Sequence, residues 1–112
     1  MTAKRFGALD LVLNTDTLLM SGPAGFSSTV NVRFVNRNST PVRVRLALVD
    51  EPAASALAEL DPEDYLEFDV SVRANGVLEN TGIVVPEDYS LVARSDTGGV
   101  TVIAFGFQEE NV

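Results

Sequence analysis

Apolar and polar side chains alternate in short blocks along most of the chain. The clearest block is 42–48, where Val or Leu occupies every second position and Arg43 and Arg45 lie between them. Because successive side chains of a β-strand point to opposite faces, this block predicts a strand with one apolar and one charged face. The same pattern predicts further strands at residues 9–13, 17–20, 28–35, 65–72, 77–85, 89–94 and 100–107.

Two of these blocks make specific predictions about burial. In the block 65–72, alternation places Leu66, Phe68, Val70 and Val72 toward the core and Glu67, Asp69 and Ser71 toward solvent. The second block, 100–107, is apolar on both faces. A strand of this kind is typical of the middle of a sheet, so we expect either a central strand or one that a neighbouring subunit covers.

Turn-forming residues separate the predicted strands. Gly, Pro, Asn, Asp and Ser gather at residues 21–25, 36–40, 73–76, 86–88 and 95–99. Residues 51–64, EPAASALAELDPED, interrupt the alternation in a different way. Their composition permits one or two helical turns between Pro52 and Pro62, but the stretch is too short for a stable independent helix. We expect a short helical or loop excursion near 51–64.

Seven or eight short strands with almost no helix signal predict an all-β fold. The expected architecture is a single antiparallel β-sandwich of the jelly-roll or immunoglobulin-like type. The chain has 112 residues, of which 46% are apolar, and this is enough for one domain with its own core. We therefore expect residues 1–112 to form a single domain, with an extended N-terminal arm over 1–6 and a loose tail over 108–112.

The composition excludes most of the catalytic and metal chemistry that small domains use. The sequence has no His and no Cys, which removes thiol nucleophiles, His-based dyads, disulfides and the usual zinc ligands. A net charge of -8 disfavours nucleic acid as a partner, because phosphate contacts need a basic face. No apolar run approaches about 20 residues and the N-terminus has no secretory signal, so we expect no membrane association. We assign no catalytic, cofactor-binding or metal-binding residues.

Half of the acidic side chains, eight of 16, lie between Asp50 and Asp69. A calcium site is one interpretation, since Ca²⁺ binds several carboxylate oxygens on a flexible loop. The chain has no EF-hand loop pattern, so we favour carboxylates that are solvated or face an interface. The interface candidates are Glu59, Asp61, Glu63 and Asp64. Paired carboxylates also suggest a glycosidase, but no acid lies in an apolar context that would raise its pKa, which disfavours an enzyme.

Four arginines carry half of the positive charge and lie on or beside one predicted hairpin. They are Arg33, Arg37, Arg43 and Arg45. If residues 36–40 form the hairpin loop, Arg33 lies nearly opposite Arg43, and like charges in that position repel. Either Glu67 and Asp69 of the next long strand neutralise the arginines within one subunit, or the acidic segment of a neighbouring subunit does so. We favour the intramolecular pairing, because exposed ion pairs require little geometry.

Several strings within residues 17–110 resemble one family of proteins. A Pro-Ala-Gly turn at 23–25 leads to a strand that ends in Asn36-Arg37, and residues 42–47 read VRVRLA. Residues 65–69 read YLEFD, residues 74–84 read ANGVLENTGIV, and Gly106-Phe107 precede the acids Glu109 and Glu110. In these motifs the chain resembles a family of small virion structural proteins of marine tailed bacteriophages, including phages of cyanobacteria.

The resemblance implies a β-sandwich that is a component of the phage particle rather than an enzyme. The expected role is a capsid decoration, or cement, protein at the capsid surface, made in the host cytoplasm. Its partners would be the major capsid protein and copies of itself, in a homo-oligomer such as a trimer. Lys4 and Arg5 of the N-terminal arm are candidates for contact with an acidic capsid surface. The alternative is a tail, baseplate or fibre module with an adaptor or receptor-binding role.

Overall fold

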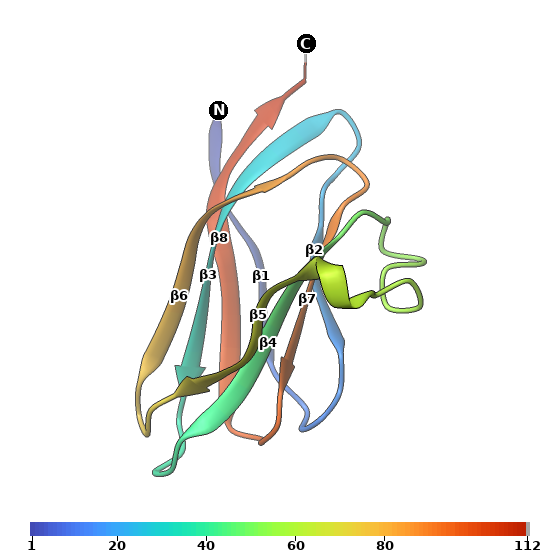
Figure 1. Cartoon of the computed structure of the whole chain (residues 1–112). Coiled ribbons are helices and arrows are strands. Elements are labelled where there is room, and N and C mark those ends of the chain that lie inside the picture. The colour runs from blue at the N-terminus through green and yellow to red at the C-terminus, as the bar shows by residue number, and fades with distance from the viewer. Residues whose placement is uncertain (112) are drawn as a thin grey trace.

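The structure is a computed structural model that describes residues 1–111 of the chain. It contains eight strands, which form two four-stranded antiparallel sheets (Figure 1). The strands are β1 (Thr2–Asp10), β2 (Thr17–Ser21), β3 (Phe26–Asn36), β4 (Val42–Val49), β5 (Tyr65–Val72), β6 (Val77–Val85), β7 (Ser90–Ser95) and β8 (Val100–Glu110). A single 3-10 turn, η1 (Pro62–Asp64), precedes β5. The predicted all-β sandwich is confirmed.

The strand order is that of a jelly roll. Sheet A has the order β1-β8-β3-β6, and sheet B has the order β2-β7-β4-β5. Strands therefore pair first with last, β1 with β8, β2 with β7, β3 with β6 and β4 with β5, as in a long hairpin rolled into two sheets. An immunoglobulin-like sandwich would place β1 beside β2 in one sheet, so the jelly-roll alternative is the correct one.

The core lies between the inner faces of the two sheets. On β3, Val30, Val32 and Phe34 point inward and are almost completely buried, while the residues between them point outward. On β4, Val44 and Leu46 are buried in the same cluster. Burial of these side chains drives the two sheets together, at about 25 cal/mol per Å² of apolar surface removed from water.

A buried asparagine joins the two sheets at one end of the sandwich. Asn36, the last residue of β3, donates hydrogen bonds from Nδ2 to the carbonyl oxygens of Thr40, Val72 and Arg73 at 2.9, 3.2 and 3.0 Å. Its Oδ1 accepts from the backbone and side-chain nitrogens of Asn38 at 2.9 and 3.1 Å. The predicted loop after β3 is thus held to the end of β5 by one side chain.

The chain termini differ from the sequence expectation. The predicted arm over residues 1–6 is not free, because Thr2–Asp10 forms β1 and pairs with β8. Residues 108–110 of the predicted loose tail belong to β8 and pair with the start of β3, whereas residue 112 lies outside the described residues. The predicted strand at 9–13 ends early, at Asp10. An exposed edge strand gives no alternation signal, and only its backbone pairing reveals it.

The burial predicted for β5 is wrong in its first half. Leu66 and Phe68 are 42% and 55% exposed, although alternation placed them in the core. The cause is a β-bulge: the pairing of β5 with β4 shifts register here, and Asp69 has a positive φ of 52°. An extra residue in one strand reverses the facing of the residues before it, here as far as a second register shift between Glu67 and Tyr65. Val72, beyond the bulge, is buried as predicted.

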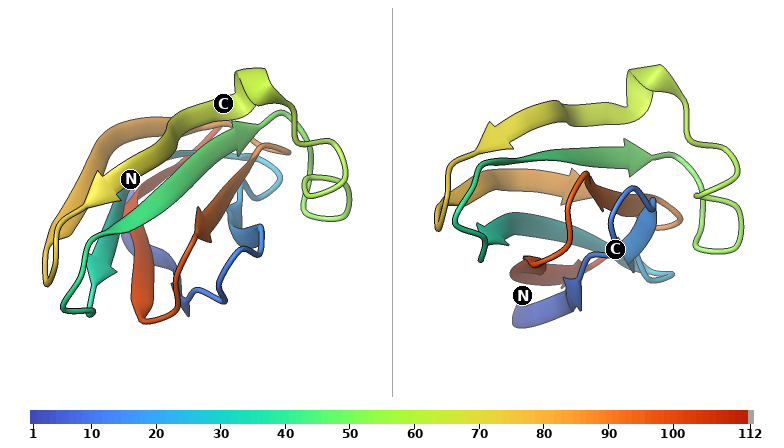
Figure 2. Two further views of the ribbon diagram at one scale, coloured as in Figure 1. Left: turned by 60° about the horizontal axis from the view of Figure 1, so that its bottom comes forward. Right: turned by 90° about the horizontal axis from the view of Figure 1, so that it is seen from below.

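Two other expectations about the strands and their connections are confirmed. β8 is a central strand, between β1 and β3. Residues 51–64 leave the sandwich as a set of turns that ends in η1, and both views of Figure 2 show this excursion projecting from one side. Ala56 of this segment is fully buried against Ala47, Val49 and Val92, so the excursion covers part of the outer face of sheet B.

Candidate interaction surfaces

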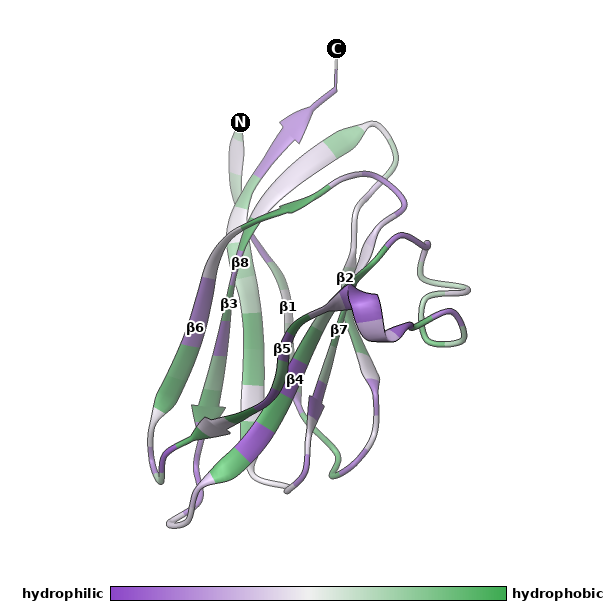
Figure 3. Ribbon diagram, viewed as in Figure 1, coloured by the Kyte–Doolittle hydropathy of each residue, from purple (hydrophilic) through white to green (hydrophobic). Residues whose placement is uncertain are grey.

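The outer face of sheet A carries apolar side chains that no described segment covers. They are Val35, Val77, Val84, Ile103, Phe105 and Phe107, and we call this set the apolar face. The hydropathy colouring shows apolar residues along β8 and near both ends of β6 (Figure 3). Val84 and Phe107 are 58% and 48% exposed. Val35 and Val77 are register partners, whereas Thr29 of β3 lies between Val84 and Phe107. Grouped exposed apolar side chains are typical of contact surfaces.

Arginines accompany the aromatic residues of the apolar face. The guanidinium of Arg33 lies 5.8 Å from the ring centroid of Phe105 and pairs with Glu79 at 2.7 Å. Arg5 is the register partner of Phe105 on β1, the strand on the other side of β8 from Arg33. Aromatic residues and arginine are enriched in the centres of protein–protein interfaces, where other charged residues are depleted.

The remaining basic candidates lie at different places around the sandwich. Arg37 donates to Asp10 at 3.1 Å and to Thr101 Oγ1 at 3.1 Å, at the end of sheet A near β1. Lys4 lies 5.8 Å from the ring centroid of Phe6. Among residues 1–111, Lys4 and Arg5 have no carboxylate within ion-pair distance.

The predicted repulsion between Arg33 and Arg43 does not exist. These residues belong to β3 in sheet A and β4 in sheet B, because the connection between the two strands crosses from one sheet to the other. The like-charged pair is instead Arg45 and Arg94, which are register partners on β4 and β7. The sequence showed Arg94 only as the end of a strand, and the partner of that strand depends on the topology.

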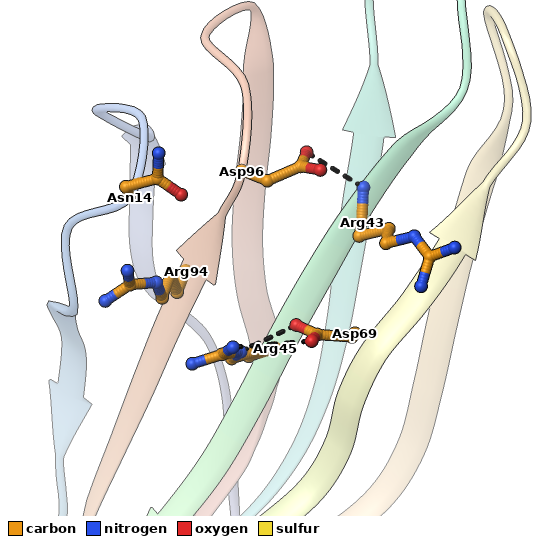
Figure 4. A pocket seen from close by; sticks show the side chains of 6 residues that line it. All are labelled: Asn14, Arg43, Arg45, Asp69, Arg94 and Asp96. Carbon is orange, nitrogen blue, oxygen red and sulfur yellow. Dashed lines mark hydrogen bonds and ion pairs between the residues drawn. The ribbon is translucent and has the colours of Figure 1, made fainter.

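A small pocket on the outer face of sheet B is lined by three arginines, Arg43, Arg45 and Arg94 (Figure 4). We call it the arginine pocket; its volume is about 130 Å³. Its lining residues are Asn14, Arg43, Arg45, Asp69, Arg94 and Asp96. They come from β4, β5, the end of β7 and two connections, so residues distant in the sequence form one site.

Ion pairs hold two of the pocket arginines in place. Arg45 donates to both carboxylate oxygens of Asp69, at 2.7 and 3.3 Å, and its guanidinium lies 4.2 Å from the ring centroid of Phe68. Arg94 pairs with Asp16 at 3.4 Å. The hydrogen bond from Arg45 lowers the pKa of Asp69, and the pKa of Arg45 is raised in turn. The predicted neutralisation by Asp69 is therefore correct for Arg45.

Glu67, the second carboxylate predicted to neutralise the arginines, and Arg43 do not take part in such a pair among the residues that the structure describes. Glu67 forms no ion pair among residues 1–111, and neither does Arg43. The backbone nitrogen of Arg43 donates to Asp96 Oδ1 at 3.0 Å, while its guanidinium extends over β5, away from Arg45 (Figure 4).

The backbone around the arginine pocket is irregular. Asn14 and Asp69 both have φ values of 52°, in the left-handed region that non-glycine residues seldom adopt. The register shift between β4 and β5 lies beside Asp69. Bulges and residues in rare conformations are concentrated at binding and catalytic sites, where they direct a side chain to a particular position.

The acidic interface candidates lie in the excursion and point to solvent. Glu59, Asp61 and Glu63 are exposed, and no ion pair within the described part of the chain involves them. Asp64 Oδ2 accepts a hydrogen bond from the backbone nitrogen of Asp61 at 2.8 Å, which caps η1. Within residues 1–111, no three or more acidic side chains are grouped closely enough to hold a metal ion. Nor does that range contain a helix long and apolar enough to cross a membrane.

Comparison with known proteins adds no family to these observations. Neither a scan against models of protein families nor a search of curated proteins finds a match to this chain. The fold alone does not decide function, because jelly rolls occur in capsid proteins, lectins and cupins.

Proposed function

We propose that this protein is a non-enzymatic virion structural protein, most specifically a capsid decoration protein that binds the major capsid protein. The resemblance of its motifs to phage virion proteins supports this role. The structural observation on which the proposal rests is the apolar face, a set of uncovered aromatic and aliphatic side chains beside arginines. Such a surface is suited to a protein partner.

The contrast between the two sheets strengthens this argument. The outer face of sheet B also carries apolar residues, Ala47, Val49 and Val92, but the chain covers them with its own Ala56. The apolar face of sheet A has no such cover among residues 1–111. Because exposed apolar surface is unfavourable in water, a second protein that covers it gains stability from the contact. A partner that binds only the assembled shell also stabilises that shell by mass action.

The absence of an enzymatic role is part of the proposal. The arginine pocket has a volume of about 130 Å³, whereas sites for small molecules usually exceed about 300 Å³. Its carboxylate Asp69 has a lowered pKa because Arg45 donates to it. General acids in glycosidases need the opposite shift.

The first experiment is the copy number of the protein in purified particles of the phage that encodes it. Gel densitometry gives the ratio of this chain to the major capsid protein. A ratio near one, or a large fixed fraction, supports a decoration protein. A ratio of a few per cent supports the alternative, a tail, baseplate or fibre module. If the chain is absent from particles, the virion role is wrong.

A second experiment tests the surface. Particles depleted of this protein are mixed with purified Phe107→Asp protein, and the bound fraction is measured after sedimentation. We expect the charged side chain to abolish binding, because it replaces an exposed apolar contact. Val12→Asp is the matched control: Val12 is exposed as well, but it lies outside the apolar face. Equal binding of the two variants would exclude the apolar face as the docking surface.

A further inference from the structure

The arginine pocket has more hydrogen-bond donors than acceptors. Each guanidinium carries five N–H groups. Among residues 1–111, Arg45 donates to Asp69 and Arg94 donates to Asp16, while the guanidinium of Arg43 has no carboxylate partner. The guanidinium of Arg43 makes no hydrogen bond among residues 1–111, so its N–H groups are available to oxygen atoms from outside the chain.

One carboxylate oxygen of Asp96 is already engaged within the chain. Its Oδ1 accepts from the backbone nitrogen of Arg43 at 3.0 Å and from Thr97 Oγ1 at 2.9 Å. This oxygen therefore fixes the loop after β7 and does not face the guanidinium of Arg43.

The electrostatic environment favours a carboxylate as the external group. Arg45 and Arg94 lie directly opposite each other, and each already pairs with a carboxylate, Asp69 and Asp16. The guanidinium of Arg43, on the β5 side of the pocket, has no such partner among residues 1–111 and is free to receive a further anion (Figure 4). The charges of Arg43 and Arg94, in addition to Arg45, lower the pKa of Asp69. The pocket thus stabilises ionised carboxylates, and its own carboxylate shows that effect.

The size of the pocket restricts what can enter. A volume of about 130 Å³ corresponds to about four water molecules at roughly 30 Å³ each. This accommodates the end of one acidic side chain.

We propose that the arginine pocket binds a glutamate of the acidic excursion of a second copy of this protein, Glu59 or Glu63. Both glutamates are exposed, and both lie on the segment that projects from the sandwich (Figures 1 and 2). Each surface also presents apolar area beside its charges: Leu57 is 47% exposed on the excursion, and Phe68 is exposed beside the pocket. The two surfaces are therefore complementary in charge and in apolar contact.

The proposed contact joins the arginine pocket of one copy to the excursion of another copy, so two different surfaces meet. Such a heterologous contact is not self-complementary, so it propagates from copy to copy and closes into a ring when the rotation permits. It uses sheet B and the excursion, and it leaves the apolar face of sheet A accessible. The proposal therefore does not depend on the virion role, and purified protein alone suffices to test it.

The first test is sedimentation velocity of the purified protein over a range of concentrations. We expect reversible association that weakens as salt rises from about 0.1 M to about 1 M, which shortens the Debye length from about 10 Å to about 3 Å. Arg43→Glu should raise the dissociation constant about tenfold or more, because it places a negative charge beside the incoming carboxylate. Its guanidinium forms no ion pair in residues 1–111, so the fold should not depend on it. The matched control is Arg73→Glu, in the exposed turn after β5, which should associate like the wild type.

Charge exchange gives the decisive result. Glu59→Lys/Glu63→Lys protein should also associate more weakly by itself, because a positive side chain then replaces the carboxylate that enters the pocket. A one-to-one mixture of this variant with Arg43→Glu protein should regain association, since each variant supplies the charge that its partner needs. Wild-type protein that stays monomeric, association unaffected by Arg43→Glu, or a mixture that stays monomeric while both variants are folded would each overturn the proposal.

Discussion

Asn36 provides the sharpest test of how the sandwich is held together. Its sequence context predicts only a loop, whereas the structure shows a side chain that is 1% exposed and makes five hydrogen bonds. Replacing Asn36 with Ala removes the donors for three carbonyl groups, of which the Val72 carbonyl is in a fully buried bond. The other two bonds are partly buried, so water can replace part of what is lost.

The expected loss follows from these contacts. A buried polar group left without its partner costs about 1 to 3 kcal/mol, and two partly hydrated groups add to this. We expect Asn36→Ala to lower the free energy of unfolding by about 3 kcal/mol. For a chain of 112 residues, an unfolding entropy of about 2.1 cal/mol/K per residue converts this loss into a fall in Tm of about 13 °C.

The assay is urea unfolding followed by far-UV circular dichroism, because the chain has no Trp to serve as a fluorescent probe. The slope of free energy against urea should stay constant while the midpoint falls. Ser39→Ala is the control: Ser39 is exposed in the same connection and its hydroxyl has no hydrogen bond among residues 1–111, so it should change stability by less than about 0.5 kcal/mol. A loss below about 1 kcal/mol for Asn36→Ala would show that the hydrogen bonds do not stabilise this end of the sandwich.

Three further predictions concern packing and charge. Leu46→Ala should cost about 2 to 5 kcal/mol in urea unfolding, whereas Leu66→Ala should cost much less; equal losses would contradict the bulge in β5. Gly22→Ala should destabilise by about 1 to 3 kcal/mol in thermal unfolding, because a Cβ there meets a backbone carbonyl, while Gly98→Ala has open space and should be tolerated. Because the folded state lowers the pKa of Asp69, this carboxylate stabilises the fold above its ordinary pKa of 3.8 and loses that effect as pH falls through the lowered value. Wild type should therefore be more stable than Asp69→Asn near neutral pH and lose that advantage in acid; a pH-independent difference in an unfolding series would refute the pairing.

Much of the fold could be predicted from alternation alone. Strands β3, β4 and β7, and the central position of β8, follow from side-chain patterns that reflect burial on one face or on both. The excursion at 51–64 was also visible, because its composition departs from that of the strands. These features are local, and a strand that packs one face on a core must show them in its own sequence.

The sites depended on information that no single segment contains. Arg33 and Arg43 looked like neighbours in a hairpin, yet the connection between their strands changes sheets. Arg94 entered the arginine pocket because β7 lies beside β4, which is a long-range choice of strand partner. The interface candidates Glu59 and Glu63 were visible as charges, but only the tertiary arrangement places a complementary pocket on the same molecule.

The class of fold, the strand positions of the core and the absence of His and Cys chemistry depend on composition and on local periodicity, so they can be read from the amino-acid sequence alone. The jelly-roll order, the pairing of β1 as an edge strand and the bulge that exposes Phe68 become visible only in the folded chain. Backbone hydrogen bonds set all three, and such bonds join residues far apart in the chain without requiring particular side chains. The same pairing places Arg33 opposite Glu79, with which it forms an ion pair.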